Sequence, residues 1–75
     1  MSNICYVIKH PELGYHVGYQ RAGIFQSYIF EVKWGDAPIL SWYISIFPTR
    51  EDAESYLKLR ACKFPSGCQI VEWVL

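Results

Sequence analysis

The segment from Phe47 to Ala53 constrains the fold of this chain more than any other, because an apolar strand stops there and a capped helix begins. Thr49 can accept a hydrogen bond from a backbone N–H of the first helical turn, and Asp52 stands three residues later in the capping-box position. Glu51 is favoured near the positive end of the helix dipole. The segment therefore predicts a helix that starts directly after Thr49.

The residues after this cap follow the three-and-four spacing of an amphipathic helix. The apolar stripe consists of Ala53, Tyr56, Leu57, Ala61 and Phe64. Pro65 and Gly67 are helix-ending residues, so we expect the helix to stop just before them.

Five other stretches carry the β-branched, aromatic or alternating pattern of strands. They span residues 4–9, 15–20, 25–34, 39–47 and 68–75. With the helix, they give the order β-β-β-β-α-β, which predicts an α+β fold: a single antiparallel sheet of about five strands with one amphipathic helix packed on one face. The last strand is expected to pair antiparallel beside the first.

The third and fourth predicted strands agree on which of their faces is buried. The face expected beneath the helix carries Tyr28, Phe30, Val32, Trp34, Leu40, Trp42, Ile44 and Ile46. The open face carries the candidate binding residues Phe25, Ser27, Ile29, Ser41, Tyr43 and Ser45. Tyrosine and serine are adaptable contact residues, and an apolar patch left uncovered by a single helix commonly marks an interface. We therefore expect this open face to bind a partner.

The length of 75 residues predicts one compact domain spanning residues 1–75. Aromatic residues make up 17% of the chain, which is more ring surface than a small core needs. A core of this size supplies only about 3–5 kcal/mol, so partner binding or self-association would supplement it. A homodimer is expected about as readily as a monomer.

Seven basic residues balance seven acidic ones, so the chain has no overall field that would concentrate a polyanion around it. Lys58, Arg60 and Lys63 nevertheless form a local basic cluster on the predicted helix. Nucleic-acid or nucleotide binding, through this cluster and the open sheet face, is therefore the weaker alternative to a protein partner.

Neither catalytic chemistry nor metal binding is predicted. His10 and His16 bracket the first turn and could share a metal, but no third ligand is suitably spaced. The carboxylates of Glu51, Asp52 and Glu54 are explained by the helix dipole. The serines include no nucleophile elbow, and the glycines form no phosphate-binding loop. We expect no cofactor, no metal and no enzymatic activity.

Cys5, Cys62 and Cys68 make an odd count, which differs from the even sets of small secreted domains. The chain has no apolar stretch long enough to span a membrane and no signal-like start, so a cytoplasmic location is expected. The expected function is that of a small non-enzymatic module that binds an unidentified protein partner. Regulators, and inhibitors encoded by phages or mobile elements, are the class that fits.

Overall fold

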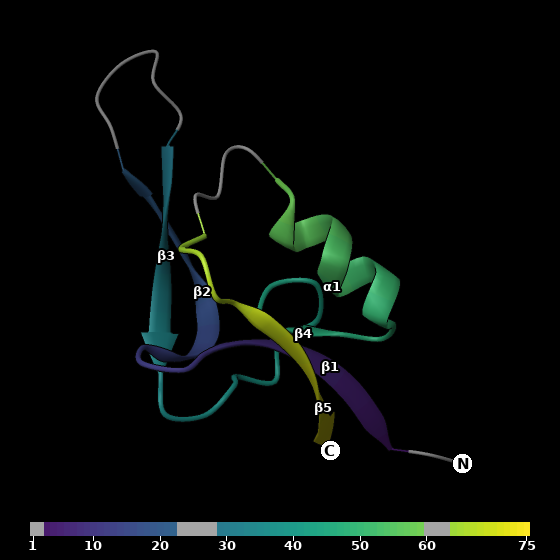
Figure 1. The fold of residues 1–75 in the computed structure, drawn as a ribbon. Coiled ribbons are helices and arrows are strands. Elements are labelled where there is room, and N and C mark those ends of the chain that lie inside the picture. Colours follow the sequence, from purple (N-terminus) through teal and green to yellow (C-terminus); the bar gives the residue numbers. More distant parts are fainter. Residues whose placement is uncertain (1–2, 23–28, 60–63) are drawn as a thin grey trace.

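The computed structural model describes residues 3–22, 29–59 and 64–75, which form one antiparallel sheet and one helix (Figure 1). The elements are β1 (Ile4–His10), β2 (Gly14–Ala22), β3 (Ile29–Gly35), β4 (Ile46–Phe47), α1 (Arg50–Leu57) and β5 (Gln69–Val74). The α+β class and the β-β-β-β-α-β order expected from the sequence are confirmed.

Strand β1 is the centre of the sheet. Strand β5 pairs antiparallel with β1 along Ile4–Lys9, as the sequence predicts for the last strand. Strands β2 and β4 share the other edge of β1: β2 pairs at Lys9 and His10, and β4 pairs at Tyr6 and Val7. Strand β3 pairs with β2 alone and ends the order β3-β2-β1-β4.

Thr49 caps the helix as predicted. Its hydroxyl oxygen accepts a hydrogen bond from the backbone N–H of Asp52 at 3.1 Å and donates one to the Asp52 carboxylate at 2.9 Å. The helix is shorter than the apolar stripe suggests, because it ends at Leu57. The Lys58 N–H is shared between the carbonyls of Glu54 and Ser55, the three-centre bonding that tightens a last turn. Ala61 lies outside the described residues.

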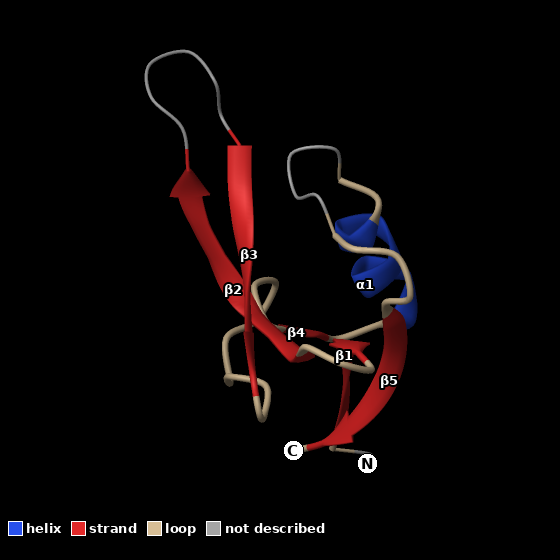
Figure 2. Cartoon of the chain, turned by 60° about the vertical axis from the view of Figure 1, so that its left-hand side comes forward, coloured by secondary structure: helices blue, strands red, loops and turns tan. Residues whose placement is uncertain are grey.

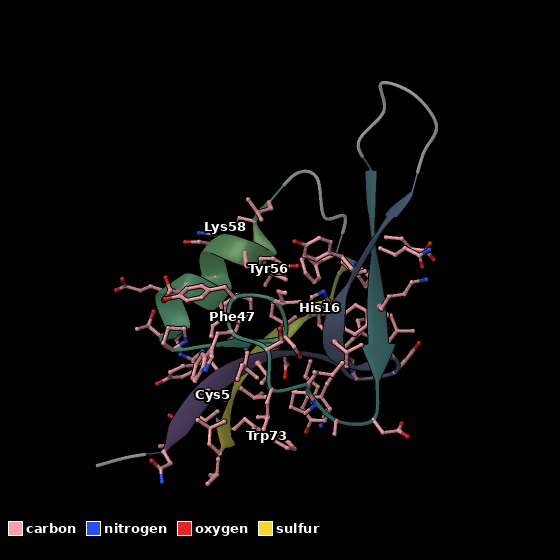
Figure 3. The ribbon with its side chains drawn as sticks, turned by 180° about the vertical axis from the view of Figure 1, so that it is seen from behind. Cys5, His16, Phe47, Tyr56, Lys58 and Trp73 are labelled. Carbon is pink, nitrogen blue, oxygen red and sulfur yellow. The ribbon has the colours of Figure 1, made fainter. Side chains whose placement is uncertain are left out.

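The core has one cluster on each face of β1. Beneath the helix, Ile8, Phe47 and Ala53 are buried. On the other face, Cys5, Val7 and Ile46 are buried, with Trp73 packed against them (Figure 3). Successive side chains of a strand point to opposite faces, so a strand in the middle of the sheet can fill both clusters. The helix covers β1, β4 and β5, and Figure 3 shows Phe47 directly beneath it.

The fourth strand predicted over residues 39–47 is wrong for most of its length, since only Ile46 and Phe47 form β4. The preceding residues turn, and half of the Trp42 surface is exposed (50%). Leu40 is 72% exposed. The expected helix-covered face of Leu40, Trp42 and Ile44 therefore does not exist. Tyr28 lies outside the described residues, and the structure describes only the backbone of Phe30.

Strands β2 and β3 form a long hairpin that extends beyond the helix-covered part of the sheet (Figure 2). A bulge between His16 and Gly18 shifts the register, and the pairs on either side are His16 with Trp34 and Gly18 with Lys33. In the described part of the chain, no helix is long and apolar enough to cross a membrane.

Candidate functional site

The connection between β3 and β4 carries a run of large apolar side chains on the surface. These exposed residues are Ile39, Leu40, Trp42, Tyr43 and Ile44. We call residues 39–44 the apolar loop; it belongs to the teal segment between the arrowhead of β3 and β4 in Figure 1. Single exposed hydrophobic residues are normal, but five of them within six consecutive positions are a local concentration of exposed apolar side chains, and such concentrations are typical of interaction sites.

The apolar loop is also free of charge. No Asp, Glu, Lys or Arg occurs between Asp36 and Arg50. The cores of protein interfaces are depleted of charged residues and enriched in aromatic ones. The composition of this loop therefore matches the centre of an interface.

Ser45 holds the apolar loop to the hairpin from inside the protein. Its hydroxyl donates a hydrogen bond to the carbonyl oxygen of His16 at 2.8 Å and accepts one from the backbone N–H of Ile39 at 3.0 Å. Ser45 is completely buried. The expectation that Ser45 lies on an open face is wrong, because its hydroxyl bridges the loop and β2.

A network of backbone hydrogen bonds makes the apolar loop a compact turn. The carbonyl of Ser41 accepts from the N–H groups of Ile44, Ser45 and Ile46, at 3.3, 3.0 and 3.2 Å. The Tyr43 N–H donates to the carbonyl of Ile46 at 2.8 Å. Several donors converging on one carbonyl fix the backbone, so the exposed side chains project from a defined support.

Tyr43 has a φ of 62°, in the left-handed region that residues other than glycine rarely adopt. This conformation costs an L-residue about 1–2 kcal/mol. Its ring stays on the surface, 59% exposed, and meets the ring of Phe47 edge-on at 6.5 Å between centroids. Such strain persists only where the surroundings impose it, and it clusters at functional sites.

Of the six binding residues expected on an open face, the structure describes the side chains of Ser41, Tyr43 and Ser45. Tyr43 is exposed as predicted, whereas Ser41 is half-buried and supplies the turn carbonyl. Ile29 begins β3, and nothing is described of its side chain. Phe25 and Ser27 lie outside the described residues. The described side chains of Ser41, Tyr43 and Ser45 thus do not share one open face, and the binding role of the six residues stays a prediction.

Sequence reasoning placed Leu40, Trp42 and Ile44 in the core because apolar and other residues alternate through this segment. The alternation does not come from a strand, because the turn at Tyr43 breaks the pleat. The one usable signal was the long run without charge, which is unusual for a loop that lies on the surface.

The alternative basic cluster is only partly described. Lys58 is exposed at the end of the helix, at the upper left in Figure 3. Arg60 and Lys63 lie outside the described residues. Nucleic-acid binding through the three together remains a prediction.

The two histidines do not face each other across the first hairpin, since His10 pairs with Gly14 and His16 pairs with Trp34. The Nδ1 atom of His10 accepts from the N–H groups of Glu12 and Leu13, which leaves Nε2 as the donor to the Ser66 carbonyl at 3.2 Å. His10 therefore ties the first turn to the segment before β5. Within the described ranges, no three potential ligands come together to hold a metal.

His16 is fully buried at the base of the hairpin, near Tyr56 of the helix (Figure 3). Its ring lies 5.0 Å from the ring of Phe64, 5.4 Å from that of Tyr56 and 5.9 Å from that of Trp34. Neither ring nitrogen has a hydrogen-bond partner among the described residues. Burial lowers the pKa of His16 to about 4, and the Gly18 backbone has a smaller effect that raises it.

An imidazole enclosed in this way is neutral near pH 7. The rings of Trp34, Tyr56 and Phe64 lie around it. It cannot reach a substrate unless the hairpin moves. Burial likewise raises the pKa of the Cys5 and Cys68 thiols, which keeps them protonated and poorly nucleophilic. Cys62 lies outside the described residues.

Comparison of the chain with protein-family models, curated proteins and solved structures finds no match. The function is therefore inferred from the residues of this chain alone. The described residues enclose no pocket. The apolar loop is consequently the strongest candidate for a functional site.

Proposed function

We propose that this protein is a non-enzymatic binding module that contacts a protein partner through the apolar loop. The observation that carries the proposal is the exposure of Leu40, Trp42 and Tyr43 on a turn that is fixed by backbone hydrogen bonds and by the buried hydroxyl of Ser45. Tryptophan and tyrosine are the side chains most often responsible for binding energy at protein interfaces.

The support beneath the loop favours binding because it lowers the entropy lost on association. The hydroxyl of Ser45 and the carbonyl of Ser41 already fix the loop backbone in the free protein. Fixing the backbone of one residue costs about 1–2 kcal/mol, and a loop that was flexible in the free protein would lose this free energy on association. A pre-organised apolar loop keeps more of its contact energy as affinity.

The expected partner surface is an apolar groove or pocket on a protein. The loop offers no charge that could meet a charged surface, and an uncharged contact is little affected by salt. A module that fills such a groove would prevent other molecules from using it. This is the action of a regulator or an inhibitor of the partner.

Affinity capture from a lysate of the native host, followed by mass spectrometry, tests the proposal when it compares matched variants. The loop variant is Leu40→Ser with Trp42→Ser, and the control is Val74→Ser. Val74 is as exposed as Leu40, at 74%, but lies at the end of β5. A protein retained by the wild type and the control, and lost with the loop variant, is the expected result.

The proposal fails if the same proteins co-purify with the loop variant and the wild type in equal amounts. It also fails if the captured material is nucleic acid that Lys58→Ala releases. That second result would establish the alternative through the basic cluster, because phosphate contacts weaken steeply with salt.

A further inference from the structure

Among the described residues, the strands β3, β4 and β5 each pair with one neighbouring strand only, and two of these three strands are protected against pairing with another strand. Strand β4 is two residues long and is followed by Pro48, which has no N–H to donate. On β5, the carbonyl of Ile70 already accepts a hydrogen bond from the Arg50 side chain at 3.4 Å. Glu72 is the only charged residue of β5, so a second copy would offer it no basic partner.

The third of these strands, β3, is neither short and followed by a proline nor hydrogen-bonded to a side chain of the described residues along its outer edge. Strand β3 is seven residues long and pairs with β2 on one side only. It contains no proline, and no hydrogen bond from another part of the described chain reaches its outer edge. An edge of this kind presents unpaired N–H and C=O groups that can accept another strand.

The sequence of β3 is complementary to itself in one register. A two-fold axis through Val32 pairs the whole strand, because it places Ile29 opposite Gly35 of the second copy. The same register places Glu31 of each copy opposite Lys33 of the other. The register that aligns the strands over their full length is thus also the one that pairs their opposite charges.

Charges on an edge strand usually prevent pairing, but these two favour it. The Glu31 carboxylate and the Lys33 ammonium already lie 3.6 Å apart in one chain, and both side chains are exposed. In the two-fold register, each carboxylate would have an ammonium from its own chain and one from the second copy. An axis moved to residue 31 or residue 33 would place like charges opposite each other.

We infer that the outer edge of β3 is the interface of a homodimer, in which two hairpins join antiparallel about Val32 into one continuous sheet. A symmetric contact of this type closes on itself and leaves no β3 edge free for further copies. It uses residues other than the apolar loop, so the partner site and the dimer contact are separately testable.

Sedimentation velocity over a concentration series of the full 75-residue chain tests the dimer. The single variants Glu31→Lys and Lys33→Glu place like charges opposite each other, so each should weaken self-association on the order of tenfold. The double variant Glu31→Lys with Lys33→Glu restores complementarity and should associate as the wild type does. A mixture of the two single variants should form a heterodimer, since one chain then offers two positive charges and the other two negative charges.

Circular dichroism of each variant checks that these exposed substitutions leave the fold intact. A wild type that stays monomeric up to millimolar concentration would overturn the inference. So would single variants that associate as strongly as the wild type, or a mixture that associates no better than its components. Loss of the dimer in Leu40→Ser with Trp42→Ser, with no effect of the charge variants, would move self-association to the apolar loop.

Discussion

The burial of His16 predicts that acid destabilises the protein through this one side chain. The ring is closed in by aromatic rings and has no hydrogen-bond partner for either nitrogen among the described residues. Protonation would place a charge among apolar groups. The unfolded chain accepts that proton near the ordinary pKa of 6.5, whereas the folded protein accepts it only near pH 4.

The sign and the size of the effect follow from this difference. As the pH falls below about 6.5, the unfolded state binds the proton before the folded state does, so the free energy of unfolding decreases. The part of the free energy of unfolding that depends on a neutral His16 is fully present above pH 6.5 and is lost by about pH 4. A pKa difference of this size corresponds to roughly 3 kcal/mol, which is comparable with the whole stability of a domain this small.

Urea denaturation followed by circular dichroism between pH 7.5 and pH 4.5 measures the effect. The matched variant is His16→Phe, which keeps an aromatic ring in the site but has no group to protonate. Its stability at pH 7.5 should equal or exceed that of the wild type, because two desolvated nitrogens are removed. The difference between the two proteins should grow as the pH falls. A His16→Phe variant with the same acid slope as the wild type would refute the reasoning.

Three further predictions test the fold by chemical denaturation. Thr49→Ala should lower the free energy of unfolding by about 0.5–2 kcal/mol through loss of the cap, and a change within error would mean that Thr49 does not cap the helix. Phe47→Ala should cost about 3–5 kcal/mol because the ring is buried, whereas Trp42→Ala should cost about 1 kcal/mol or less; the reverse order would exchange surface and core. Tyr43→Gly should be about 1 kcal/mol more stable than Tyr43→Ala, since only glycine adopts a φ of 62° without strain; equal stabilities would contradict the left-handed turn.

The parts of the fold that the sequence predicted correctly depend on local signals. Thr49 and Asp52 specify the helix start through bonds that they make with each other and with the first turn. Residues 4–9 and 68–75 are rich in β-branched and aromatic residues, and they form β1 and β5. No boundary of these two strands differs from the predicted one by more than one residue. Their antiparallel pairing followed from strand directions alone.

The candidate site could not be predicted because it depends on contacts between distant residues. Ser45 holds the apolar loop to β2 only because its hydroxyl donates to the carbonyl of His16, which is 29 positions away in the sequence. The bulge between His16 and Gly18 changes which residues of β2 face the helix α1. As a result, the ring centroids of Tyr19 and Tyr56 lie 6.3 Å apart. Alternation in a sequence carries no sign of such a bulge or of the left-handed Tyr43.

Calorimetric titration of the captured partner into the wild type and into Trp42→Ser most directly tests the claim that the apolar loop binds a protein. The loop should supply the energetic centre of the contact, so Trp42→Ser should weaken binding at least about tenfold. Affinity should change little between low and high salt, and Lys58→Ala should bind as the wild type does. An unchanged affinity for Trp42→Ser, together with loss of binding in Lys58→Ala and at high salt, would contradict the claim and assign function to the basic cluster.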